Sequence, residues 1–412
     1  MFSWFTGSGD KVSTDETKID ELLSRSVANV LPSKDALKKL LLSGKRLKFY
    51  IGTDATGPQL HLGHSTNYLI LEKFRKLGHE IVILFGDYTA LIGDPSDKEA
   101  VRKQQTPAQI AGHIRDWKSQ VEKIVDFEDT GNPARILCNS EWLSKLSFSD
   151  LIDIASTFTV QQMLERDMFE RRVRENKPVY LHEFFYPLMQ GYDSVAMNVD
   201  VEMGGTDQTF NMLTGRTLQK KYNNKEKFII TTTLLEDPST GKKLMSKSEG
   251  SYIALNDGPA EMFGKTMALP DGVIKQMFID TTLLSVSEIE VILKDRPRDS
   301  KIRLAFELVR LYHGATAAEN AKKNFESVFS GGGDPSSLAK EVVVKEGDTL
   351  KDLIVMSGAA SSMSAAHRLI EEGAVTRLPD TKISDAHMKI SSQEKGAIFR
   401  FGKKHFVKIR LL

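Results

Sequence analysis

The spacing of apolar residues predicts a sheet with helices between its strands in the first part of the chain. Residues 47–51 and 81–85 have the apolar runs of strands, and the apolar positions of residues 64–77 recur at helical spacing before Gly78. The run at 81–85 is apolar on both faces, which is typical of a parallel sheet covered by helices. Further strands are expected at residues 135–138, 199–203 and 228–234. The pattern predicts a Rossmann-like, doubly wound α/β domain.

The rest of the chain follows different patterns. Residues 19–42 have helical spacing and form an expected helical lead-in, with Ser33 as an N-cap. From about residue 259 to 329 helical patterns dominate, and residues 301–312 are the clearest amphipathic case. The glycine-rich stretch at 330–337 is typical of a linker. We therefore expect a catalytic domain at 1–250, an α-helical domain at 251–329, a linker at 330–341 and a small α+β module at 342–412.

Composition is that of an ordinary globular protein. The 412 residues are 40% hydrophobic and 27% charged, with a net charge of +1. No apolar run is long enough to cross a bilayer, and the first residues do not have the pattern of a secretory leader, so we expect no membrane association and a cytoplasmic location. The only cysteine, Cys138, provides neither an internal disulfide nor a metal cluster, and no set of protein ligands for a structural metal is expected.

The first chemical motif lies between the first strand and its helix. In the sequence YIGTDATGPQLHLGH, which runs from Tyr50 to His64, His61 and His64 lie on either side of Gly63 at a helix start. Backbone N–H groups and the helix dipole attract phosphate there, and two imidazoles can donate hydrogen bonds to a phosphoryl group. The alternative is a pair of loop histidines that cap a helix.

The second motif, GKKLMSKSEG at residues 241–250, follows the last predicted strand of the α/β domain. Lys247 lies between two serines in a loop with glycine at both ends, and such a lysine can neutralise the β and γ phosphates of a nucleotide as pyrophosphate departs. The alternative is a solvated basic loop. The two motifs together favour nucleotidyl transfer.

These motifs resemble the two signatures of class I aminoacyl-tRNA synthetases. His61 to His64 resembles the first signature, HIGH, and residues 244–248 resemble the second, KMSKS. Residues 91–96, 186–193 and 204–208 resemble segments of the bacterial-type tyrosyl-tRNA synthetases within that class. The similarity extends over nearly the whole chain from about residue 19. It implies a tyrosine-tRNA ligase that uses ATP, L-tyrosine and tRNA(Tyr).

A phenol requires a polar partner at the base of a mostly apolar pocket, and Tyr50 and Asp193 are candidates. Gln190 and Asp193 are three residues apart, which places them on one face of a helix. The alternative is that both are ordinary surface side chains. The resemblance implies that Tyr50 and Asp193 contact the tyrosine hydroxyl, that Asp94, Tyr186 and Gln190 hold the α-ammonium, and that Gln208 lies near the carboxylate.

The resemblance also implies an ATP site. Asp207 is expected at the ribose, His61 and His64 at the α-phosphate, and Thr56 at the phosphates. Lys98 and Arg102 match a mobile basic loop that closes on pyrophosphate, although both are equally compatible with ordinary surface charge. The other expected ATP-binding residues are Gly52, Asp54, Gly63, Gly205, Met245, Lys247 and Ser248.

The expected reaction needs no covalent enzyme intermediate. The tyrosine carboxylate attacks the α-phosphorus of ATP, and Mg²⁺ is expected to accompany the nucleotide. Two positions depart from the family pattern. Leu244 replaces the first lysine of the second signature, and Ile51 offers only its backbone where ribose contacts are expected. Both departures affect contacts with ATP and leave the expected reaction unchanged.

The C-terminal module is basic. From Lys345 onward it has twelve Lys or Arg and eight Asp or Glu. Residues 361–375 resemble the RNA-binding module first known from a small-subunit ribosomal protein. Arg368, Arg377, Lys403 and Lys404 are the expected tRNA contacts, and a solvated basic face is the alternative.

Two alternative functions are considered, and the resemblance also has a consequence for the oligomeric state. A tryptophan-specific relative would share both signatures, but Tyr50 and the segment 190–193 argue against it. A non-catalytic RNA-binding protein on a synthetase scaffold is the second alternative, and the retained His61, His64 and Lys247 argue against that. The resemblance also implies a homodimer, with an interface near residues 158–174.

Overall fold

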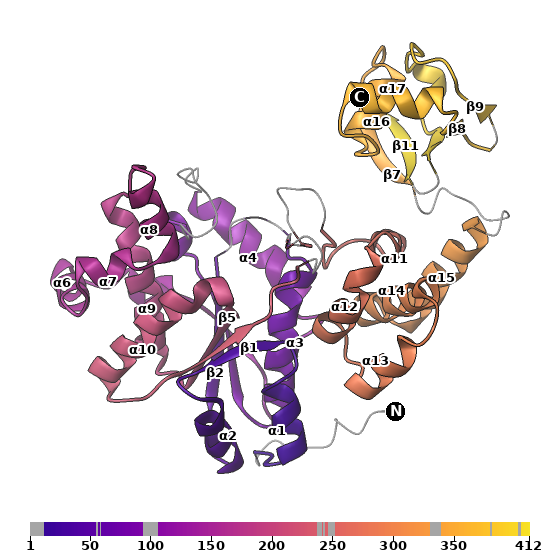
Figure 1. The fold of residues 1–412 in the computed structure, drawn as a ribbon. Coiled ribbons are helices and arrows are strands. Elements are labelled where there is room, and N and C mark those ends of the chain that lie inside the picture. The colour runs from indigo at the N-terminus through magenta and orange to yellow at the C-terminus, as the bar shows by residue number, and fades with distance from the viewer. Residues whose placement is uncertain are drawn as a thin grey trace. The chain divides into compact units, whose positions relative to one another are not determined.

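The computed structural model forms two compact units, drawn in Figure 1. One comprises residues Met1–Asn256 and Lys275–Glu290, and the other comprises Asp257–Ile274 and Val291–Leu412. This division into two units does not test the domain boundaries predicted from the sequence, which stay a prediction. The structure describes residues 12–54, 57, 59–93, 106–236, 241, 244–245, 252–329, 339–379, 381–402 and 405–412.

The first unit is built on a six-stranded sheet. Its strand order is β1-β6-β5-β2-β3-β4, and all neighbours are parallel except the pair of β1 and β6. The interior strands are buried because their residues are apolar on both faces, as the sequence predicted. The strands are β1 (Val27–Leu31), β2 (Lys48–Thr53), β3 (Glu80–Phe85), β4 (Arg135–Cys138), β5 (Val201–Gly205) and β6 (Phe228–Thr232).

The expected helical lead-in is wrong in its middle. Helix α1 (Glu16–Leu22) and helix α2 (Lys34–Leu42) are present, and the Ser33 side chain caps α2 as predicted. Between them, however, β1 adds to the edge of the sheet beside β6. Five residues are too few for their periodicity to separate a strand from a helix, so only the partner strand determines this conformation.

Helices connect the parallel strands and cover the sheet. α3 packs against β2 and β3, and α10 packs against β5, β6 and α9. The residues that follow α9 and α10 as C-caps, Asn198 and Asn224, have positive φ angles of 49° and 48°, a left-handed conformation that asparagine tolerates. The helices are α3 (Leu62–Lys76), α4 (Pro107–Val121), α5 (Ser140–Leu143), α6 (Phe148–Ala155), α7 (Val160–Leu164), α8 (Asp167–Arg174), α9 (Phe185–Met197), α10 (Thr209–Asn223), and the 3₁₀ turns η3 (Leu181–Phe184) and η4 (Thr206–Gln208).

The second unit contains helices and a separate small sheet. α14 (Pro297–His313) includes the predicted amphipathic stretch and packs against α11 (Pro259–Met267) and α15 (Ala315–Phe329). The sheet order is β7-β11-β10-β8-β9. Its elements are β7 (Lys340–Val344), α16 (Leu350–Met356), α17 (Met363–Glu371), β8 (Val375–Arg377), β9 (Thr381–Lys382), β10 (Ile398–Phe401) and β11 (His405–Leu411). Helices α12 (Ile274–Thr281) and α13 (Val286–Ile292) lie where the two units alternate along the chain.

The small sheet and its two helices have their own apolar core. Leu350, Leu353 and Ile370 of the helices are fully buried against Phe399 of β10. Because helices and strands of this part of the chain share one apolar core, they pack together as an α+β module. In the described part of the chain, no helix is long and apolar enough to span a membrane.

Candidate functional site

The candidate site lies at the carboxyl ends of the neighbouring strands β2 and β5. The strands are parallel neighbours, with Ile51 opposite Met203, and the direction of chain progression across the sheet reverses between them. Ligands of doubly wound sheets bind in the crevice at the carboxyl ends of strands at this point. The segment after β2 leads to His61, and the segment after β5 contains Asp207. The topology therefore brings the first signature and the 204–208 segment to one edge of the sheet.

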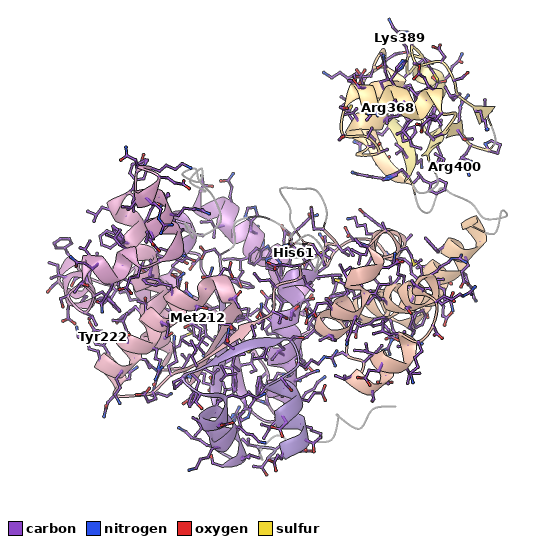
Figure 2. All side chains as sticks on the ribbon, in the orientation of Figure 1. His61, Met212, Tyr222, Arg368, Lys389 and Arg400 are labelled. Atoms are coloured by element: carbon purple, nitrogen blue, oxygen red, sulfur yellow. The ribbon has the colours of Figure 1, made fainter. Side chains whose placement is uncertain are left out.

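His61 and His64 lie together at the start of α3, where Figure 2 labels His61. His61 is the N-cap residue in an extended conformation, and its backbone N–H donates to Nδ1 of His64 over 3.2 Å. The two ring centroids are 3.9 Å apart. Because Nδ1 of His64 accepts a hydrogen bond, the neutral ring carries its proton on Nε2, and Nε2 is then the donor toward a phosphate.

The structure joins the two signatures through Gly63 and Met245. A Cβ atom on Gly63 would lie 3.1 Å from the His61 ring and 3.5 Å from Cβ of Met245, so this close packing depends on glycine. Met245 is buried, and its Sδ accepts from the backbone N–H of Ile253 over 3.5 Å. Leu244, the departure from the family pattern, is half-buried.

Asp54 links the predicted nucleotide and amino-acid ends. Its Oδ2 accepts from the Tyr186 hydroxyl over 3.0 Å, and its Oδ1 accepts from the Thr89 hydroxyl over 2.7 Å. A side chain at Gly86 would collide with both Asp54 and Thr89. Asp54 was predicted at ATP and Tyr186 at the α-ammonium, so a single hydrogen bond couples the two predicted subsites.

Tyr50 and Asp193 are both buried, on β2 and α9 respectively. The Tyr50 hydroxyl is hydrogen bonded to Oγ of Ser194 over 3.0 Å. Oδ1 of Asp193 accepts from Trp142 Nε1 over 2.7 Å, and Oδ2 accepts from Asn139 Nδ2 over 3.2 Å. The alternative interpretation of Asp193 as a surface carboxylate is wrong, because it is only 2% exposed.

Burial dominates the electrostatics of this pair. It raises the pKa of the Asp193 carboxyl well above its usual range, although the hydrogen bonds from Trp142 and Asn139 oppose the shift. Burial also raises the pKa of the Tyr50 hydroxyl, and the negative charges of Glu202 and Asp193 add to this effect. Tyr50 therefore keeps its proton at neutral pH, and Asp193 is held in place by two donors.

Gln190 and Gln208 are connected through Asn211. The Asn211 side-chain amide donates to Oε1 of Gln190 over 2.9 Å and to Oε1 of Gln208 over 3.0 Å. Gln190, half-buried, also donates from Nε2 to Glu202 Oε1 over 3.1 Å. The structure thus places two predicted tyrosine-binding residues from α9 and η4 around one buried asparagine.

The remaining described ATP-site predictions lie on strand ends. Gly52 is the fifth residue of β2, and a Cβ there would make only ordinary contacts, the nearest 3.8 Å from Leu84. Gly205 ends β5, and a Cβ there would collide with Oδ1 of Asp207. The side chain of Ile51 is buried in the sheet, which agrees with its expected backbone role.

Several predicted site residues lie outside the described residues. Within the described part, no group of three or more His, Cys, Asp or Glu side chains could hold a metal ion. The predicted site residues that lie outside it are Thr56, Asp94, Lys98, Arg102, Lys247, Ser248, Lys403 and Lys404.

The predicted tRNA contacts that the structure describes both belong to the small C-terminal sheet and helices. Arg368 is exposed on α17 and Arg377 is half-buried at the end of β8. Figure 2 shows Arg368 and Arg400 on this same part of the molecule. The side chain of Arg410 on β11 is also exposed.

Polar residues that were not predicted from the sequence support the predicted site. Glu202 interrupts an otherwise uncharged, buried strand, and a buried charge of this kind signals a specific partner. Lys227 directly precedes the apolar strand β6 and carries the same signal. The other residues that were missed carry no such signal, because their roles depend on the tertiary structure: Thr89, Asn139, Trp142, Ser194 and Asn211.

Comparison with known proteins gives a consistent result. A family model described as tRNA synthetases class I (W and Y) matches residues 42–330. A tyrosine--tRNA ligase from Moorella thermoacetica is 39% identical over 418 residues, which cover 99% of each chain. One from Carboxydothermus hydrogenoformans is 40% identical over 403 residues, covering 94% of this chain and 97% of that protein.

Solved structures give the same fold. A C-terminally truncated mitochondrial tyrosyl-tRNA synthetase from Aspergillus nidulans aligns with a TM-score of 0.65 at 23% identity, over 76% of this chain and 94% of the other. A tyrosyl-tRNA synthetase from Archaeoglobus fulgidus, complexed with L-tyrosine, aligns with a TM-score of 0.57 at 21% identity, over 75% and 100% of the two chains. At this identity the likeness concerns the fold alone.

Proposed function

Because the chain belongs to the class I tRNA synthetases of the tryptophan and tyrosine (W and Y) family, we propose that it is a tyrosine-tRNA ligase. It activates L-tyrosine with ATP and transfers the tyrosyl group to the 3′ end of tRNA(Tyr). The observation that carries the choice of tyrosine is the burial of Tyr50 on β2 and Asp193 on α9, close enough for the charge of Asp193 to act on the Tyr50 hydroxyl. A phenol O–H is both a donor and an acceptor, so it can donate to an oxygen of Asp193 and accept from the protonated Tyr50 hydroxyl.

The first step is adenylation. The tyrosine carboxylate oxygen attacks the α-phosphorus of ATP, the bond to the β-phosphate oxygen breaks, and pyrophosphate leaves. His61 and His64 at the start of α3 donate hydrogen bonds to the phosphoryl oxygens, where the helix dipole also favours negative charge. Lys247 is proposed to neutralise the departing pyrophosphate.

Mg²⁺ belongs to this step as part of the nucleotide substrate. Magnesium in such sites is commonly held through substrate phosphates and water with few protein carboxylates. The chain's own residues orient the carboxylate of tyrosine toward the α-phosphorus: Gln208 near the carboxylate, and Tyr186 and Gln190 at the ammonium, joined with Asp94. No protein nucleophile is required.

The second step transfers the tyrosyl group to tRNA. The terminal ribose hydroxyl attacks the carbonyl carbon of the adenylate, and AMP leaves. Arg368 and Arg377 in the C-terminal module are proposed to contact phosphates of the tRNA, together with Lys403 and Lys404. We propose a cytoplasmic location, which is supported by the role in translation and by the single cysteine, a composition that suits a reducing compartment.

We also propose that the chain forms a homodimer through α6, α7, α8 and η3. Large apolar side chains are exposed along these elements. Figure 1 shows α6, α7 and α8 at one end of the first unit. Contiguous exposed apolar surface is typical of protein interfaces. The residues and their exposed fractions are Phe148 (78%), Ile152 (55%), Val160 (64%), Val173 (55%), Tyr180 (46%) and Leu181 (73%).

Light scattering tests the dimer. Leu181→Lys should shift the protein toward monomer at micromolar concentration, because burying a lysine in an apolar interface is unfavourable. Val291→Lys is a matched control, since Val291 is similarly exposed, at 63%, on α13. A Leu181→Lys protein that stays as dimeric as the control contradicts this interface.

Aminoacylation tests the proposed function. Purified protein, ATP, Mg²⁺ and radioactive tyrosine should convert bacterial tRNA(Tyr) into acid-precipitable tyrosyl-tRNA. Radioactive tryptophan with tRNA(Trp) is the comparison. Acylation with tryptophan alone would assign the protein to the other specificity of the family.

A further inference from the structure

A lysine–glutamate pair lies buried beside the proposed tyrosine site. Lys227, just before β6, is 0% exposed, and Glu202 on β5 is 1% exposed. The Lys227 ammonium contacts Oε2 of Glu202 as an ion pair. Gly215 on α10 leaves the space that the ammonium occupies, because a Cβ at Gly215 would collide with Nζ. Strand and helix packing therefore hold the pair in one position.

The pair has hydrogen bonds toward both ends of the proposed tyrosine. Nζ of Lys227 donates to Oγ of Ser194 over 2.9 Å, and the same Oγ is 3.0 Å from the Tyr50 hydroxyl. On the other side, Oε1 of Glu202 accepts from Nε2 of Gln190 over 3.1 Å. Tyr50 is the proposed partner of the substrate hydroxyl, and Gln190 the proposed partner of its α-ammonium.

The Glu202 carboxylate determines the orientation of the Gln190 amide. An ionised carboxylate only accepts hydrogen bonds, so Gln190 must direct its NH₂ group toward Glu202. Its carbonyl oxygen is then on the other side, where Asn211 donates to it over 2.9 Å. An ammonium group only donates, so the carbonyl is the end of the amide that the substrate requires.

Lys227 in turn balances the negative charge of Glu202 through their ion pair. A carboxyl group this deeply buried would favour its neutral form if no positive charge were near. A neutral carboxyl also has a donor, and either end of the Gln190 amide could then face it. Burial lowers the pKa of the Lys227 ammonium, and the charge of Glu202 opposes this shift. The pair is thus mutually dependent.

A purely structural role explains less of this arrangement. Apolar residues of similar volume would commonly stabilise a core as well as a buried ion pair does. Here the pair's hydrogen bonds to other side chains run to Ser194 and Gln190, which connect it to both proposed substrate contacts.

We propose that Lys227 and Glu202 are positioning residues for tyrosine: through Gln190 and Ser194 they fix the partners of the α-ammonium and of the phenol hydroxyl. This inference rests on the proposed function. It assigns selectivity to a charged pair that does not itself touch the substrate.

Steady-state pyrophosphate exchange tests the proposal with Lys227→Met, which keeps most of the length of the side chain and removes its charge. The KM for tyrosine should rise about tenfold or more, while the KM for ATP stays within about twofold. The preference for tyrosine over phenylalanine should fall, because Ser194, the partner of the Tyr50 hydroxyl, loses the Lys227 donor that fixes it. A general weakening of the fold would instead affect both substrates and would leave the preference unchanged.

Two further variants complete the design. Lys225→Met is the matched control, since Lys225 is a nearby lysine whose Nζ contacts Asp200 over 3.0 Å and the carbonyl of Asn198 over 2.8 Å. The double variant Lys227→Met with Glu202→Gln buries no charge and keeps the test available if Lys227→Met alone does not fold. The amide introduced by Glu202→Gln can present either of its ends to Gln190, so the double variant should also show a raised KM for tyrosine.

The outcomes separate this proposal from the proposed function. If the unmodified protein gives no tyrosine-dependent exchange, the proposed function fails. If it does, and a folded Lys227→Met or double variant keeps the control's KM for tyrosine and its preference over phenylalanine, the positioning role is wrong.

Discussion

The proposed tyrosine-binding end and the proposed phosphate-binding end of the site are built in different ways. At the tyrosine end, buried and half-buried side chains from β2, α9 and β5 form hydrogen bonds with one another, as in the contacts of Tyr50 with Ser194 and of Gln190 with Glu202. At the phosphate end, the described groups are the first turn of α3 and the imidazoles of His61 and His64. One end is a network of side chains, and the other is a helix start.

This difference corresponds to two physical tasks. Discrimination between similar amino acids requires polar groups that stay unpaired when the wrong substrate binds, and such groups must be fixed in advance. Stabilisation of a phosphoryl transition state requires donors and positive charge, which a helix N-terminus supplies with little side-chain chemistry. Substitutions at the two ends should therefore change different kinetic parameters.

The largest effect is expected for Asp193→Ala. It removes the proposed acceptor of the substrate hydroxyl and leaves Trp142 and Asn139 without their shared partner. We expect a loss in kcat/KM for tyrosine on the order of a thousandfold or more. Pyrophosphate exchange measures it, and thermal melting checks that the variant is folded. Normal activity in a folded Asp193→Ala protein would remove the pocket assignment.

A smaller loss with a different signature is expected for His64→Ala. The imidazole acts in the transition state, so kcat should fall about a hundredfold while the KM for tyrosine changes little. His387→Ala, an exposed histidine in the C-terminal module, is the control. A rise in the KM for tyrosine without a change in kcat would contradict the separation of the two ends.

Arg368→Ala should leave both ends of the activation site intact. We expect the KM for tRNA to rise about fivefold and pyrophosphate exchange to remain normal, because one phosphate contact is lost. Arg135→Ala, at the start of β4, removes a similarly charged side chain that is 56% exposed and serves as the control. Equal effects of the two substitutions on tRNA binding would argue against a specific contact.

A fall in pH is expected to lower the stability of the fold and to have the smallest effect on selectivity. His79 precedes β3, at the edge of the sheet opposite the site, and burial lowers its pKa to about 4. The unfolded chain takes up this proton below about pH 6.5 and the folded chain does not, so its contribution to stability is present above that pH and is lost as the pH falls. From pH 7 to pH 5 the loss is about 2 kcal/mol.

Denaturant unfolding at several pH values measures this loss, and His79→Gln should flatten the slope between pH 7 and pH 5. The preference for tyrosine over phenylalanine should stay the same over this range in protein that remains folded. An unchanged slope in His79→Gln would show that other groups cause the acid sensitivity.

The sequence predicted the strands of the parallel sheet because their apolar runs are continuous and short. It missed β1, since residues 27–31 take their conformation from pairing with β6, a partner some 200 residues away. The chain passes to the second unit at residue 257 and returns to the first at residues 275–290. This alternation depends on packing, so the local sequence pattern does not predict it.

For the site, the sequence identified residues that belong to recognisable segments, such as His61, His64 and Asp193. The supporting residues were missed because hydrogen bonds between distant segments define them. Asn139 and Trp142, for example, contact Asp193 from the N-cap and the body of α5, more than 50 residues away. Glu202 and Lys227 were detectable as charges in buried strand regions, but their pairing needed the structure.

The central claim is that this chain activates tyrosine, and amino-acid-dependent exchange of labelled pyrophosphate into ATP tests it most directly. The measurement needs no tRNA and is made with each of the twenty amino acids. The account predicts exchange with tyrosine alone. Exchange with tryptophan in place of tyrosine would contradict the specificity, and no exchange with any amino acid would favour a non-catalytic RNA-binding protein.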